Sequence, residues 1–165
     1  MSPALNRILF ATDLSRNCYF AFRHVVMLAK LSGAEIHNLH VVEPLSEDAR
    51  VTLSIFVQDD EKRKEALANR MGPAKERLEQ RQDRFWAEEV SEEDRHVRDQ
   101  IVSLEIIEGH AAETILRRAE EKKCDLIVLG THEHGFSHTF LGSTAKRVLR
   151  RAGIPTLIVP YRPEA

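Results

Sequence analysis

Five short apolar segments recur along the chain, and longer segments with a helical periodicity separate them. The apolar segments do not alternate strictly with polar residues, which is typical of strands covered on both faces of a parallel sheet. They span 7–12, 35–42, 101–107, 125–129 and 156–159. Because a helical segment lies between each pair, the order predicts a Rossmann-like α/β fold, with a five-stranded parallel sheet, right-handed crossovers and helices on both faces.

The helical segments are recognised by their apolar faces and by the residues at their ends. Ser15 is a candidate N-cap for the first helix, and Gly33 is the residue expected to stop it. Gly153 and Pro155 end the last helix, over 142–152. The predicted buried faces are Cys18, Phe22, Val25 and Ala29 in the first helix, Ala112, Ile115, Leu116 and Ala119 in the helix before the fourth strand, and Ala145, Val148, Leu149 and Ala152 in the last.

A long charged segment, about 45–98, separates the second strand from the third. Most of it has helical character, and we expect an interruption near Gly72 and Pro73, because proline restricts the preceding residue and lacks an N–H. The second part has an apolar stripe. The charges favour a solvated helical face with mixed ion pairs, with a charged docking surface as the alternative. The stripe consists of Ala74, Leu78, Phe85 and Trp86.

Composition narrows the class of protein. A length of 165 residues predicts one domain, 1–165, and a net charge of −2 gives no overall attraction to nucleic acid or to anionic lipid. The two cysteines, Cys18 and Cys124, lie in apolar segments and are expected to be buried thiols in a reducing compartment. Without an apolar run of membrane-spanning length or a secretory signal, we expect a cytoplasmic protein that binds neither nucleic acid nor membrane.

Candidate chemistry lies in the loops that follow the first and fourth strands, because α/β sheets bind ligands at the carboxyl ends of their strands. Gly130 follows the fourth strand and allows a ligand to approach the backbone. The Gly-Ser-Thr sequence at 142–144 offers N–H groups, hydroxyls and the positive end of a helix, with Lys146 and Arg147 one turn further on. The alternative is a plain turn in which Ser143 or Thr144 caps the helix. The chain has no Walker A motif and no GxGxxG after the first strand.

Two further interpretations of the second loop carry less weight. His132, His134 and His138 lie within seven residues and resemble a zinc ligand set, but no cysteine pair accompanies them. A catalytic triad of Ser143, a histidine and Asp13 lacks the GxSxG elbow. We therefore expect no metal site and no catalytic residue. Asp13 is equally suited to binding a ligand and to capping the first helix, and His40 is expected to be packed at a strand end.

The sequence resembles the universal stress protein family over nearly its whole length. The resemblance is carried by ILFATDLS, EIHNLHVVEP, IEGHAAETILRRAEEKKCDLIVLGTHEHG and FLGSTAKRVLRRAGIPTLIVP. It implies an adenine nucleotide alpha hydrolase-like fold and a homodimer that pairs through the last strand, Thr156 to Val159. One branch of this family binds ATP, with Mg²⁺ as a possible companion. The residues that the resemblance places around the nucleotide are Ala11, Thr12, Asp13, Val41, Gly130, Thr131, His132, Gly135, Gly142, Ser143 and Thr144.

The glycine motif of the ATP-binding branch is incomplete in this sequence. Its pattern is Gly, two residues, Gly, nine residues, and Gly with Ser or Thr; here Glu133 replaces the second glycine, and the loop from Gly130 to Gly142 is one residue short. A carboxylate beside the phosphates would repel them, although Gly135 restores some flexibility. Two functions follow: an ATP-binding stress protein with at most slow ATP hydrolysis, or a dimeric stress and interaction protein of the same fold that binds no ATP.

Overall fold

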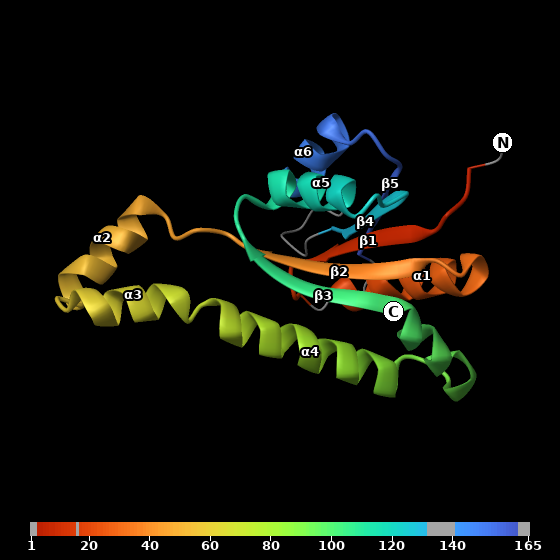
Figure 1. The fold of residues 1–165 in the computed structure, drawn as a ribbon, viewed down its shortest axis with the longest axis horizontal. Helices are drawn as coiled ribbons and strands as arrows, with labels where there is room; N and C mark the ends of the chain where they lie inside the picture. The colour runs from red at the N-terminus through yellow and green to blue at the C-terminus, as the bar shows by residue number, and fades with distance from the viewer. Residues whose placement is uncertain (1–2, 16, 132–140, 162–165) are drawn as a thin grey trace.

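The computed structural model describes residues 3–15, 17–131 and 141–161, and its centre is one parallel sheet (Figure 1). The strands lie in the order β3-β2-β1-β4-β5, and every neighbouring pair is parallel. The expected five-stranded sheet is therefore confirmed, with ends that differ by at most one residue. The strands are β1 (Arg7–Thr12), β2 (Glu35–Val42), β3 (Ile101–Glu108), β4 (Leu126–Gly130) and β5 (Thr156–Val159).

Helices cover both faces of the sheet, as the alternating pattern predicts (Figure 1). α1 and α4 lie on one face, and α5 and α6 lie on the other. The helical elements are α1 (Asn17–Ser32), α2 (Glu47–Phe56), α3 (Asp60–Ala68), α4 (Met71–Glu88), the 3₁₀ helix η1 (Glu92–Gln100), α5 (Ala111–Glu121) and α6 (Ser143–Arg151).

Each face of the sheet has its own hydrophobic core. Under α1 and α4 the core is aromatic: Phe22 lies edge-on to Phe85 at 4.8 Å between ring centroids, and Phe10 lies 5.0 Å from Phe22. Such tilted arrangements suit the ring quadrupoles. Under α5 and α6 the core is aliphatic, built around Leu9 and Ile127. The sheet therefore separates two cores of different composition.

At the end of α1 the expected stop at Gly33 is confirmed, whereas at its start the described residues do not form the expected side-chain cap. Gly33 has φ of +74° directly after the helix, the left-handed conformation that glycine adopts without strain. At the other end, Ser15 accepts a hydrogen bond from Cys18 N–H through its backbone carbonyl. Within the described residues its hydroxyl lies 3.7 Å from Cys18 Sγ, so the expected side-chain cap by Ser15 is not formed there.

The charged segment contains separate helices, and its interruption lies earlier than predicted. The chain breaks at Asn69 and Arg70, whereas Gly72 and Pro73 lie in the first turn of α4. Proline is tolerated there because the first-turn N–H groups have no partner within the helix. The predicted stripe is confirmed: Ala74, Leu78, Phe85 and Trp86 are all buried.

The last helix buries a narrower face than its sequence predicts. Ala145 and Val148 are buried, but Leu149 is 44% exposed, so its placement in the buried face is wrong. α6 packs beside α5, and Ala145 and Val148 reach the core between these helices and the sheet. A helix in that position is covered along only part of its circumference, which leaves Leu149 toward solvent.

Candidate functional site

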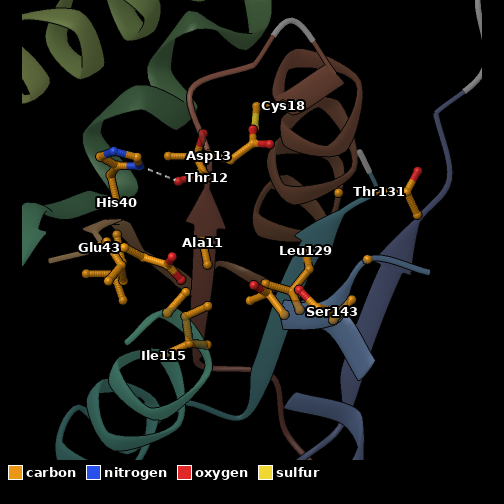
Figure 2. Close-up of a pocket in the computed structure, with 17 residues that line it drawn as sticks. Ala11, Thr12, Asp13, Cys18, His40, Glu43, Ile115, Leu129, Thr131 and Ser143 are labelled. Carbon is orange, nitrogen blue, oxygen red and sulfur yellow. Dashed lines mark hydrogen bonds between the residues drawn. The ribbon is translucent and has the colours of Figure 1, made fainter. Parts of the chain in front are cut away.

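A cavity of about 350 Å³ opens at the carboxyl ends of β1, β2 and β4 (Figure 2). The strand order explains its position. β1 is central, the chain first builds β2 and β3 on one side of it, and it later places β4 and β5 on the other. The loops after β1 and β4 therefore diverge and leave a crevice between them, which is where open α/β sheets bind ligands.

The structure brings most of the sequence-predicted site residues together around this cavity. His132 and Gly135, together with Glu133 and the other loop histidines, lie outside the described residues. The predicted residues that line the cavity are Ala11, Thr12, Asp13, Val41, Gly130, Thr131, Gly142, Ser143 and Thr144.

Several lining residues were missed by the sequence analysis. Glu43 and His40 lie at the carboxyl end of β2, and the rule that singled out the loops after β1 and β4 applies equally to them. Cys18 contributes from the start of α1, and its only signal in the sequence was an apolar spacing. The remaining missed residues are Leu39, Ala111, Ile115, Leu129 and Ala145.

The turn after β1 is held by its own polar side chains. Leu14 has φ of +64°, which is rare for a residue with a branched side chain. Its N–H donates to Thr12 Oγ1 at 3.1 Å, and the N–H of Ser15 donates to Asp13 Oδ1 at 2.9 Å. Asp13 therefore shapes the turn at the start of α1 while it lines the cavity, so both of its expected roles remain compatible with its position.

Cys18 lies against this turn as a protonated thiol. Its Sγ donates to Asp13 Oδ1 at 2.9 Å. Burial raises the pKa of the Cys18 thiol to about 11, and the neighbouring charge of Asp13 adds to the shift. Because the thiolate is the reactive form of cysteine, a nucleophilic role for Cys18 at neutral pH is disfavoured.

His40 connects the ends of β2 and β1. Its Nδ1 lies 2.7 Å from the carbonyl oxygen of Thr12 (Figure 2). A carbonyl oxygen only accepts, so Nδ1 carries the hydrogen and donates it. This contact agrees with the expectation of a packed histidine at a strand end, and it fixes the ring as part of the cavity wall.

Gly130 and Thr131 pack against neighbouring elements at the end of β4. A Cβ added to Gly130 would lie 3.4 Å from the Cβ of Ala21, so the position of the missing side chain faces α1. Thr131 accepts a hydrogen bond from the N–H of Tyr161 through its Oγ1 at 2.9 Å. These two residues thus present mainly backbone to the cavity.

The start of α6 forms the wall opposite β2. Gly142 is the N-cap residue and makes no side-chain cap, so the alternative in which Ser143 or Thr144 caps the helix is wrong. Ser143 and Thr144 are instead the first two helical residues. The N–H groups of a first turn have no partner within the helix, and the positive end of the helix dipole lies there. This wall is chemically suited to an anion.

The two sides of the cavity therefore differ in electrostatic character. Figure 2 shows Asp13, His40 and Glu43 on the side of β1 and β2, and Ser143 on the opposite side. Carboxylates accept hydrogen bonds from hydroxyls and amines, whereas a helix N-terminus attracts negative charge. A ligand with hydroxyl or amine groups at one end and an anionic group at the other matches both walls.

The described part of the chain shows neither a metal centre nor a membrane-spanning helix. It contains no group of three or more His, Cys, Asp or Glu side chains placed to hold a metal ion. None of its helices is long and apolar enough to cross a membrane.

The sequence is similar to that of known proteins over most of its length. A family model described as the universal stress protein family matches residues 4–160. Universal stress protein G of Shigella flexneri is 34% identical over 139 residues, covering 84% of this chain and 86% of the relative. Universal stress protein MJ0577 of Methanocaldococcus jannaschii is 27% identical, covering 96% of this chain and 97% of the relative.

Solved structures share the fold. The structure of MJ0577 superimposes with a TM-score of 0.68 and 22% identity, covering 98% of this chain and all of that one (100%). A universal stress protein in complex with cAMP superimposes with a TM-score of 0.59 and 20% identity, covering 95% and 98% of the two chains.

Proposed function

The chain belongs to the universal stress protein family, and from that premise we propose that its cavity binds an adenine nucleotide, ATP in particular. The observation that carries this proposal is the pairing of two unlike walls across one cavity. The start of α6 supplies backbone N–H groups for phosphate, and the ends of β1 and β2 supply acceptors for ribose hydroxyls or the adenine amine.

Size and position support the same ligand. A cavity of about 350 Å³ lies within the range of small-molecule sites, and a nucleotide at a switch point uses the sheet as other doubly wound folds do. One structural neighbour is a universal stress protein in complex with cAMP. Glu133 stands where the family motif has its second glycine, so we expect weaker binding than in a chain with the intact motif, because a carboxylate beside the phosphates would repel them.

Nucleotide content and calorimetry test the proposal. We expect purified protein to release adenine nucleotide on denaturation, or to bind Mg-ATP in titration calorimetry. Ser143→Glu places a carboxylate at the first position of α6, which favours the helix but repels phosphate, so ATP binding should weaken by about tenfold or more. Ser143→Ala keeps the backbone N–H and serves as the matched control.

The opposite result identifies the second function. If no nucleotide is released and millimolar Mg-ATP gives no heat, the chain is a stress protein with a differently used cavity. If Glu133→Gly then gains binding, the incomplete loop is the cause. We expect any ATP hydrolysis to be slow. Among the described lining residues, Asp13, His40 and Glu43 are the side chains that could activate water, and Asp13 and His40 already make hydrogen bonds within the protein.

We also propose that two copies pair through β5. This strand forms the edge of the sheet, and Leu157 and Ile158 are only half-buried within one chain. An apolar edge strand needs cover, and a second copy supplies it with a self-complementary surface. Light scattering during gel filtration should give the mass of a dimer, and a monomer at every concentration would contradict the pairing.

A further inference from the structure

A second hollow, of about 700 Å³, lies between α1 and α4. It shares no lining residue with the cavity at the strand ends, within the part of the chain that is described. Three aromatic side chains contribute to it: Tyr19 and Phe20 from α1, and Tyr161 beyond β5. We call it the α1–α4 groove, and its volume lies within the range of small-molecule sites.

Arginines line one side of the groove in a regular row. Arg77, Arg81 and Arg84 are spaced four and three residues apart on α4, so they project from one face of the helix. Arg84 pairs with Glu88 at 2.9 Å, and Arg23 of α1 pairs with Glu89. One end of the groove is thus neutralised by carboxylates.

The other end keeps its positive charge. Among the described residues, neither Arg77 nor Arg81 has a carboxylate partner. Arg77 Nε donates only to the carbonyl of Pro73 at 3.4 Å, and Arg81 Nη1 donates to the carbonyl of Ser15 at 3.2 Å. Within the described ranges, these neutral carbonyl acceptors leave both guanidinium groups without a counter-charge, with further N–H donors on each.

Aromatic rings hold this charged end in place. The guanidinium of Arg81 lies 5.8 Å from the ring centroid of Tyr19, a cation–π distance. Tyr19 in turn lies 5.8 Å from the buried ring of Phe85, so the core orients Tyr19 and Tyr19 orients Arg81. From Arg81 to Glu89 the helix rises about 12 Å over eight residues, which is enough for a phosphate and an attached ring.

We propose that the α1–α4 groove binds an organic phosphate, with the phosphate between Arg77 and Arg81 and its apolar part on Tyr19 and Phe20. The planar guanidinium forks match phosphate oxygens with paired N–H donors. The aromatic side chains add contact area for a ring that inorganic phosphate lacks. The carboxylates of Glu88 and Glu89 disfavour a second anionic group at the far end, so a singly phosphorylated ligand fits best.

Phenyl phosphate is a suitable probe, because it carries a ring and one phosphate but no adenine. Titration calorimetry of the full chain should show binding of phenyl phosphate, and inorganic phosphate should bind about tenfold more weakly. The double variant Arg77→Gln and Arg81→Gln should weaken phenyl phosphate binding by about tenfold or more. A double variant at the exposed residues Arg117 and Arg150, each changed to Gln, removes the same charge elsewhere and should bind as the parent does.

Two further measurements test whether a loss of binding comes from misfolding, and whether phenyl phosphate binds in the nucleotide cavity instead. Arg81→Lys keeps the positive charge but lacks the planar guanidinium fork, so it should still weaken phenyl phosphate binding. Circular dichroism melting checks that each variant is folded. The titrations are repeated with Ser143→Glu, which weakens phosphate binding at the start of α6, so heat that this variant keeps and the arginine variants lose comes from the α1–α4 groove. The proposal is overturned if phenyl phosphate gives no heat, if the arginine variants bind it as tightly as the parent, or if the groove proves to be covered by a second copy.

Discussion

The inserted segment between β2 and β3 contains two regions that are similar in charge but different in how they are stabilised. α4 buries a full stripe on the sheet, whereas α2 and α3 bury no residue and extend beyond the carboxyl edge of the sheet as an arm (Figure 1). Figure 1 shows α3 continuing the line of α4 away from the sheet, with α2 set at an angle at its outer end. The residues that α4 buries are Ala74, Leu78, Gln82, Phe85 and Trp86.

The capping pattern is the reverse of the burial pattern. In the arm, Ser46 accepts from the N–H of Ala49 at 3.2 Å, and Asp59 accepts from the N–H of Glu61 at 2.9 Å. α4 begins at Met71 without any side-chain cap. Local hydrogen bonds therefore support the helices that lack tertiary contacts, and the helix with tertiary contacts forms without them. Two stretches of similar charge in one inserted segment thus owe their helical structure to different forces.

The largest expected effect is the loss of an aromatic anchor of α4. Phe85→Ala removes a fully buried ring that contacts Phe22, Tyr19 and Trp86, and should lower the free energy of unfolding by about 3–5 kcal/mol. Urea denaturation followed by circular dichroism measures it. Ile55→Ala, on the exposed side of the arm, is the control. Equal losses for the two variants would remove the distinction between α4 and the arm.

Thiol reactivity should differ between the body and the arm by roughly two orders of magnitude at pH 8, from the difference in thiolate fraction. Burial raises the pKa of both Cys18 and Cys124 to about 11, whereas a cysteine introduced by Ser54→Cys on the exposed face of α2 should titrate normally. Labelling with a maleimide, followed by mass spectrometry, compares them. Fast labelling of Cys18 in the folded protein would contradict its burial.

The raised pKa of the Cys18 thiol also predicts that the free energy of unfolding depends on pH. A thiol whose folded pKa is raised above its ordinary value of 9.0 contributes stability that is complete below pH 9.0 and is lost as the pH rises through about 11. The free energy of unfolding should therefore fall between these values, and Cys18→Ala should reduce that fall.

A smaller change in the free energy of unfolding, this time an increase, is expected for a substitution beneath α4. Asn38 of β2 is fully buried, and neither atom of its amide has a hydrogen-bond partner among the described residues. It lies in register with Phe10 of β1, so its side chain points into the aromatic core. Asn38→Leu keeps the number and branching of the side-chain heavy atoms, removes both polar groups, and should raise the free energy of unfolding by about 1–3 kcal/mol. A loss of stability in urea denaturation would show that the amide has a partner in solution.

The smallest global effect is expected for the cap of the arm. Ser46→Ala should change the global free energy of unfolding by less than about 0.5 kcal/mol, because α2 packs little against the body. Hydrogen exchange of the α2 amides should nevertheless become several-fold faster, since the cap is worth about 1 kcal/mol locally. Exchange in α4 should not change. If α4 also exchanged faster, the two regions would unfold together.

The fold and part of the site follow from the sequence alone. Apolar runs that are covered on both faces mark buried parallel strands, so β1, β2 and β5 were predicted with their observed bounds. Gly33 stops α1 because a left-handed residue is a local requirement. The two ends of the glycine motif, Gly130 and Gly142, were found because a ligand-binding loop follows a strand and precedes a helix. Each of these signals lies within a few residues of chain.

Only the tertiary structure decided which elements meet. The order β3-β2-β1-β4-β5 brings Asp13, Glu43 and Ser143 around one cavity, although they are far apart in the sequence. The same long-range packing turns Gly130 toward α1, leaves Leu149 half-exposed and separates α4 from the arm. Periodicity shows which face of a segment is apolar, but the partner that covers this face is set by contacts between distant residues, and one sequence pattern is compatible with burial or with exposure.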